Sequence, residues 1–165
     1  MASDEFDGNA RASAKLSALW MRVVDELDVK EFRRPGARAS ETLGDIAESL
    51  VTGVFAVHRL SSQASGIAKS EALVGASFPA KSSRIFVLER AIAELAEDEL
   101  KAVLIREFFR GLLVYREGPE HVLGLTAVEQ EEESDDLMRE LGFETEADLA
   151  ECLRSAWPLD ARRRG

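Results

Sequence analysis

The chain has 165 residues, enough for one domain with a substantial core, and a composition of 45% apolar and 32% charged residues is typical of a globular protein. Its 31 acidic and 21 basic residues give a net charge of −10, which disfavours nucleic acid and anionic membranes as partners. A single cysteine, Cys152, excludes an intrachain disulfide framework. We expect neither a secretory leader nor a membrane span, and therefore a cytoplasmic protein.

The first part of the chain predicts two helices joined by a basic linker. Residues 1–9 are small and acidic, and we expect a disordered terminus there. Apolar residues then recur at three- and four-residue spacing over 11–28, which predicts a helix with one buried face. Residues 30–39 contain a Pro-Gly pair and several arginines, a composition typical of a turn. Ser40 is placed to cap a second helix, expected over 41–60.

The middle of the chain predicts a small sheet. Residues 61–66 are rich in serine and are expected to form a loop, while 72–78 fit a short strand. The clearest strand is 84–89, a short run of β-forming residues followed by a helical pattern. A short helical turn is expected over 90–95.

Helices are predicted for most of the remaining chain. One spans 98–115, with acidic residues at its start, where the helix dipole favours them. Residues 120–128 fit a loop or a short helix. Two acid-rich helices are expected over 129–141 and 145–156, divided by Gly142, a good residue for ending a helix.

Together these elements predict an α+β fold, mostly helical with one small β-sheet. We find no internal repeat and no low-complexity tract that would divide it. One domain is therefore expected over 10–160, with a basic tail over 161–165.

Charged residues interrupt the most apolar helix of the sequence. The helix over 98–115 is apolar on nearly every face, which is typical of a buried helix. Arg106 and Arg110 lie one turn apart on one of its faces, and Glu107 projects to the side. Buried guanidinium groups need carboxylate partners, because an unpaired buried charge costs several kcal/mol. We therefore expect a further acidic residue to reach this face from elsewhere in the chain.

The segment Arg106-Glu107-Phe108-Phe109-Arg110 and the residues before it resemble a zincin metallopeptidase. In that family the helix carries His-Glu-x-x-His, in which two histidines one turn apart bind zinc and the glutamate activates the attacking water. Arg106 and Arg110 stand at the histidine positions and Glu107 at the glutamate. The run 84–89 is similar to the edge strand of that active site, so the resemblance implies a minimal zincin-like fold.

The resemblance continues downstream and covers residues 80–145. Glu131-Glu-Glu-Ser-Asp135, followed by a Leu-Gly-Phe helix end, resembles the Glu-x-x-Ala-Asp segment of the gluzincin branch, found in small bacterial and phage zinc peptidases. It implies that Glu131 stands at the third zinc ligand and Asp135 at the acidic residue supporting the site.

Arginine departs from the family pattern where zinc would bind. It is a permanent cation with no lone pair for a metal, so we expect no zinc, no other cofactor and no metal-dependent proteolysis. Two guanidinium groups restore the charge of Zn²⁺ and bind carboxylates through paired hydrogen bonds. We hypothesise that an ion cluster of Arg106, Arg110, Glu107 and Glu131 replaces the metal. The alternative is that both arginines extend to solvent.

These observations favour a non-catalytic metallopeptidase-like protein, a pseudopeptidase that binds a protein or peptide partner. Extended peptides pair with sheet edges, and the acidic surface suits a basic or neutral partner. One alternative is a plain helical interaction or assembly module without zincin ancestry, and another is a metal-independent enzyme using Glu107. The arrangement of strand 84–89 along helix 98–115, with Glu131 over both arginines, would discriminate between them. The sequence indicates no oligomeric state.

Three other residues have chemistry that a site could use. His58 lies on an apolar stripe and is expected to be a core or interface histidine. His121 is expected in a solvated loop. Cys152 lies beside two leucines on a helix face and is expected to be an inert buried thiol.

Overall fold

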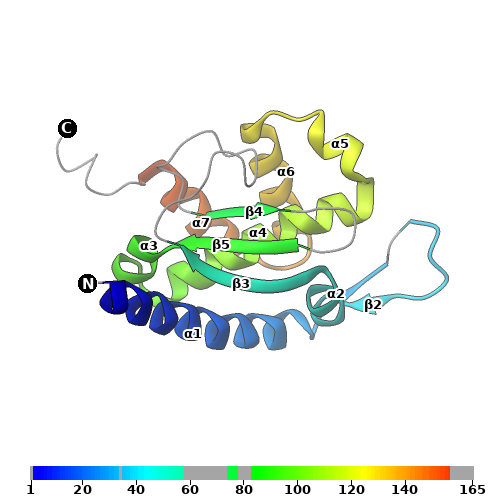
Figure 1. Ribbon diagram of the computed structural model, residues 1–165. Helices are drawn as coiled ribbons and strands as arrows, with labels where there is room; N and C mark the ends of the chain where they lie inside the picture. The colour runs from blue at the N-terminus through cyan, green and yellow to red at the C-terminus, as the bar shows by residue number, and fades with distance from the viewer. Residues whose placement is uncertain (1, 34, 58–73, 78–82, 157–165) are drawn as a thin grey trace.

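The computed structural model describes residues 2–33, 35–57, 74–77 and 83–156 (Figure 1). Helices make up most of this part of the chain, so the α+β prediction is confirmed. The elements are α1 (Ala2–Leu27), β1 (Glu31–Phe32), β2 (Glu41–Thr42), α2 (Leu43–Leu50), β3 (Val51–Val57), β4 (Val74–Ser77), β5 (Ser83–Leu88), α3 (Glu89–Glu94), α4 (Glu97–Glu117), α5 (Pro119–Leu123), α6 (Ala127–Glu140) and α7 (Glu144–Ala156). The serine-rich segment 61–66, His58 and the tail 161–165 lie outside the described residues.

The main sheet has three strands in the order β3-β5-β4. The central strand β5 is parallel to β3 and antiparallel to β4. One face buries side chains such as Val54, Ala56, Ile85 and Val87. The strand predicted over 84–89 is confirmed as β5, but the comparison with an edge strand is wrong, because β5 has a partner on each side. Of the described strands, β3 and β4 form the edges of this sheet.

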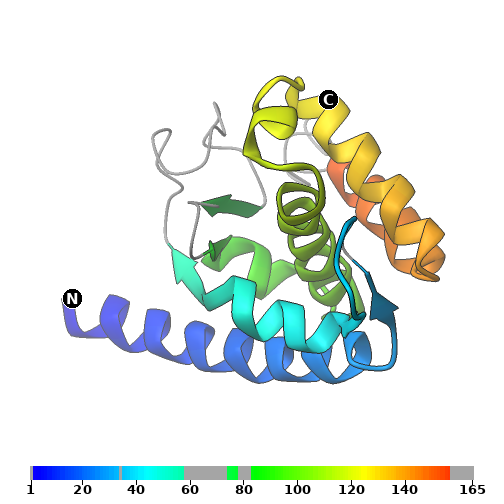
Figure 2. The same cartoon turned by 90° about the vertical axis from the view of Figure 1, so that its right-hand side faces the viewer.

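Helix α4 is the central layer of the molecule. Figure 2 shows the sheet on one side of α4 and the pair α6 and α7 on the other. Helix α1 packs on β3 and also contacts α4. This position explains why apolar residues occur on nearly every face of α4, among them the fully buried Phe108 and Phe109.

The helix predicted over 41–60 is wrong beyond Leu50, where the chain continues as strand β3. Thr42, not Ser40, caps the N-terminus of α2, because its hydroxyl accepts a hydrogen bond from the Asp45 backbone N–H at 3.1 Å. The β3 sequence is rich in β-branched and aromatic residues, which suits a strand, and its backbone pairs with β5. The apolar residues of this segment have helical spacing in the sequence, but the segment forms a strand. Burial alternates along it, with Val54 buried, Phe55 exposed and Ala56 buried.

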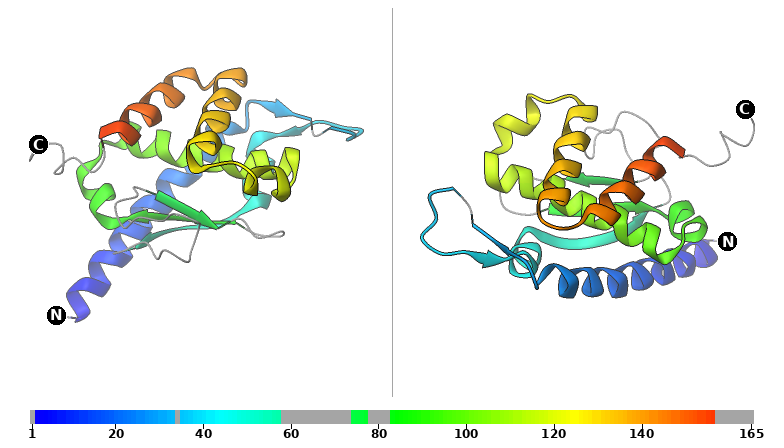
Figure 3. Two further views of the ribbon diagram at one scale, coloured as in Figure 1. Left: turned by 90° about the horizontal axis from the view of Figure 1, so that it is seen from above. Right: turned by 180° about the vertical axis from the view of Figure 1, so that it is seen from behind.

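Two further boundaries differ from the prediction. Helix α1 begins at Ala2, within the segment expected to be disordered. The expected linker over 30–39 contains β1, which pairs with β2 in a second, two-stranded sheet. Figure 3 shows this hairpin projecting from the rest of the molecule. Gly36, with φ of 82°, supplies the left-handed backbone conformation within the hairpin loop.

The remaining helices follow the predicted order. Gly118 caps the C-terminus of α4, and Gly142 lies two residues after the end of α6; both have positive φ. Thr126 and Glu129 cap α6 reciprocally, each side chain accepting a hydrogen bond from the other residue's backbone N–H. Over the described residues, no helix has the length and apolar character needed to cross a membrane.

Candidate functional site

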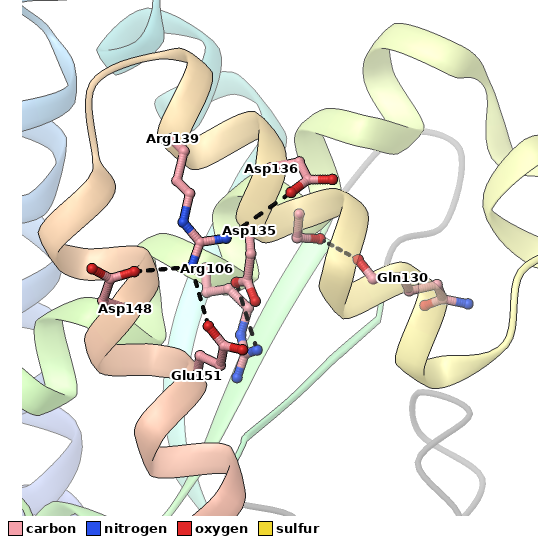
Figure 4. Close-up of polar contacts among 8 residues, drawn as sticks. Arg106, Gln130, Asp135, Asp136, Arg139, Asp148 and Glu151 are labelled. Atoms are coloured by element: carbon pink, nitrogen blue, oxygen red, sulfur yellow. Dashed lines mark hydrogen bonds and ion pairs between the residues drawn. The ribbon is translucent and has the colours of Figure 1, made fainter.

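A buried ion pair joins α4 to α6. Arg106 Nη1 lies 3.8 Å from Asp135 Oδ1, and their side chains are 5% and 3% exposed. Figure 4 shows Arg106 extending from α4 beneath α6, with Asp135 descending towards it. The sequence predicted that an acidic residue from elsewhere would reach this arginine, and Asp135 does so.

The Arg106–Asp135 pair is close enough for charge attraction but too long for a hydrogen bond. Among the described residues, neither Nε nor Nη1 of Arg106 has a hydrogen-bond partner. Burying a guanidinium with unsatisfied N–H groups costs free energy, so this pair contributes less stability than a bidentate pair would.

A second ion pair lies within α4 itself. Arg110 Nη2 is 2.8 Å from Glu107 Oε2, and the two side chains are 14% and 6% exposed. The residues are three positions apart, a spacing that brings side chains together on a helix. Neither arginine therefore extends freely into solvent, in contrast to the alternative considered from the sequence.

Glu131 lies on α6 one turn before Asp135 and is half-buried. Residues four positions apart share a helix face, so Glu131 belongs to the side of α6 that carries Asp135. Its membership of the ion cluster with Arg106 and Arg110 stays a prediction. The structure thus brings together Arg106 with Asp135 and Arg110 with Glu107.

Arg139 is a structural residue that the sequence reasoning did not assign to any role. From α6, its Nη2 bonds Asp148 at 2.9 Å and Glu151 at 3.1 Å, both on α7 (Figure 4). The pKa of Arg139 is raised above its usual value, mainly by the hydrogen bond to Asp148. The signal was present in the sequence, because Arg139 is the basic residue within the acid-rich stretch 129–151.

The remaining candidates differ from their expectations in part. His121 is exposed as expected, but it lies on α5 and its Nε2 is 3.0 Å from Glu133 Oε2. The expectation of a buried Cys152 is wrong, because the residue is exposed. The α7 face towards α4 is formed instead by residues such as Ala147, Ala150 and Leu153, which are buried.

Metal ligands are not gathered at this site. In the part of the chain that the structure describes, no three His, Cys, Asp or Glu side chains lie together in a way that could hold a metal ion. Arg106 and Arg110 occupy the positions from which the resemblance would supply two ligands, and guanidinium groups cannot ligate zinc.

Strand β4 gives the sheet an edge near α4. It pairs with β5 through Val74–Ser77 and is the outer strand on its side among those described. Helix α4 contacts both β4 and β5. An edge strand presents backbone N–H and C=O groups that an extended peptide can pair with.

Comparisons of the chain with family models, with curated proteins and with solved structures found no match. The zincin resemblance therefore stays a prediction from the sequence pattern.

Proposed function

We propose that this protein is a non-catalytic, metallopeptidase-like binding protein that takes an extended peptide or protein segment along the edge of β4. In this proposal the zinc site of a peptidase is replaced by ion pairs on α4 and α6. The exposed free thiol of Cys152 suits a reducing compartment, so we place the protein in the cytoplasm.

The buried ion pairs carry the proposal. Arg106 and Arg110 stand where the resemblance places metal ligands, and each lies near a carboxylate that the resemblance also assigns to the site. The paired charges fill this position with groups that do not activate water as zinc does. A buried cation–carboxylate arrangement joining α4 to α6 supports a role in holding the scaffold together rather than in catalysis.

The outer edge of β4, which pairs with no further described strand, supports peptide binding. Backbone pairing with an edge strand gives affinity without a catalytic group, and neighbouring side chains give selectivity. The net charge of −10 favours partners that are basic or neutral overall and disfavours nucleic acid.

Two proline substitutions in β4 test this proposal. Consecutive residues of an antiparallel strand direct their N–H groups to opposite sides, so Gly75→Pro and Ala76→Pro form a matched pair. One removes an N–H that faces β5, and the other removes an N–H that faces outward. Peptides would be selected from a random 12-residue library displayed on phage, and their affinity for each folded variant measured by fluorescence polarisation.

We expect the outward-facing proline to abolish binding of the selected peptides while circular dichroism and the thermal midpoint stay near those of the parent protein. The inward-facing proline identifies itself by a lower thermal midpoint, because it removes a bond to β5. Selected peptides that bind the outward-facing variant as tightly as the parent would contradict binding at this edge, as would failure to select any peptide.

A further inference from the structure

Two aromatic side chains lie side by side on neighbouring strands of the main sheet, on the face opposite its buried side. Phe55 on β3 is in register with Phe86 on β5, and their rings stack with centroids 5.9 Å apart. Phe55 is 42% exposed. The residue in register with Phe86 on β4 is Gly75, which has no side chain.

The same face already shows how a ring covers a glycine. A Cβ atom built at Gly53 would lie 2.7 Å from the Phe55 ring, so that ring occupies the space above the Gly53 backbone. Aromatic side chains cover glycines in sheets in this way, because the missing side chain leaves room on the pleated surface. Glycine contributes no side chain to this register position, so a side chain from a strand docked beyond β4 can lie beside Phe86 as far as the described residues show.

A charged residue lies two positions along the same strand. Arg84 is exposed on β5 and is in register with Ser77, a small residue of β4. Alternate residues of a strand share a face, so Arg84 and Phe86 lie on one side of the sheet. On β4, the small residues Gly75 and Ser77 are therefore in register with Phe86 and Arg84.

From this juxtaposition we propose that the segment docked on β4 carries an aromatic residue opposite Gly75 and an acidic residue opposite Ser77. The inference rests on the proposed function and specifies its ligand. The two residues are separated by one position, because side chains on one face of a strand recur every second residue. A docked strand would lie about 10 Å from β5, a distance that a large aromatic ring towards Phe86, or an acidic side chain together with Arg84, can span.

The test repeats the phage selection with three proteins: the parent, Gly75→Val and Arg84→Glu. The parent should enrich an aromatic and an acidic residue separated by one position, in either order. Valine fills the place beside Phe86, so Gly75→Val should lose the aromatic preference. Charge reversal should change the acidic preference to a basic one, a switch that mere structural damage would not produce. In a selected peptide, aromatic-to-alanine substitution should weaken binding about three- to tenfold.

The outcomes separate this inference from the proposed function. Peptides that bind and are blocked by the outward-facing proline, but lack the aromatic and acidic pair, would overturn the inference and leave the proposed function standing. Failure to select any peptide would overturn both. Light scattering that shows a dimer dissociated by the same proline would also overturn the inference, because a second copy would then occupy the edge.

Discussion

Removing Arg106 should destabilise the protein far more than removing an exposed arginine. The side chains of Arg106 and Asp135 are both buried, so Arg106→Ala takes a cation from beside a buried carboxylate. Breaking such a pair costs about 3–5 kcal/mol, because the carboxylate keeps its desolvation penalty. The free energy of unfolding would be measured by urea denaturation, followed by tryptophan fluorescence, to which the buried Trp20 contributes.

A matched control exists between α1 and the start of α4. Arg22 pairs with Glu97, and their side chains are 60% and 57% exposed. Arg22→Ala should lower the free energy of unfolding by less than about 1 kcal/mol, since water and salt screen an exposed pair. Equal losses for Arg106→Ala and Arg22→Ala would refute the account of a buried ion pair.

The imperfect geometry of the Arg106–Asp135 pair gives a second, opposite expectation. The charged atoms are 3.8 Å apart, and two nitrogens of Arg106 have no hydrogen-bond partner among the described residues. Replacing both residues with apolar ones, as Arg106→Met with Asp135→Leu, should therefore recover most of the loss and could exceed the parent's stability by about 1–4 kcal/mol. A double variant as unstable as Arg106→Ala would show that the two residues are not coupled.

Three other outcomes can be measured on the same protein. Arg106→His with Arg110→His should gain zinc affinity, measured by calorimetry, and a folded double variant without binding at micromolar zinc would contradict the metallopeptidase resemblance. Hydrogen bonds from Thr126 lower the pKa of Glu129, so this cap should stabilise α6 above the usual glutamate pKa and weaken as pH falls through the lowered value. The Thr126 backbone N–H, the larger cause of this lowering, remains in Thr126→Ala, so NMR titration should show the Glu129 pKa rising only part of the way towards its usual value. Cys152 should react with a thiol reagent in the folded protein as fast as in urea, and protection would contradict its exposure.

Sequence patterns predicted the elements whose signals are long or chemically specific. Apolar residues on nearly every face of α4 indicated a buried helix, and its packing between the sheet and α6–α7 agrees. The need for a carboxylate beside Arg106 followed from the cost of burying a charge. Gly142 marked the end of α6, because glycine adopts positive φ without a steric penalty.

Some sequence patterns fit both a helix and a strand, and the local sequence alone could not decide between them. The run Val51–Val57 fits the apolar stripe of a helix as well as a strand, and pairing with β5 selects the strand by satisfying its backbone groups. Residues 72–78 were expected to form a short strand, and β4 lies within them, but that local pattern did not indicate that β4 pairs with β5 and makes it the central strand. Cys152 lies between positions that face the core, and only the rotation of α7 against α4 exposes it.

The candidate site shows the same division. The sequence alone determined that two arginines and a glutamate lie within two adjacent turns of a buried helix, because i to i+3 and i to i+4 spacing is a local property of the helix. It also determined that acidic residues follow within one later helix. The position of Asp135 beside Arg106 depended on how α6 packs across α4, because the two residues lie on different helices. Likewise, the strand register alone brought Gly75 beside Phe86, since residues distant in sequence become neighbours only when the sheet forms.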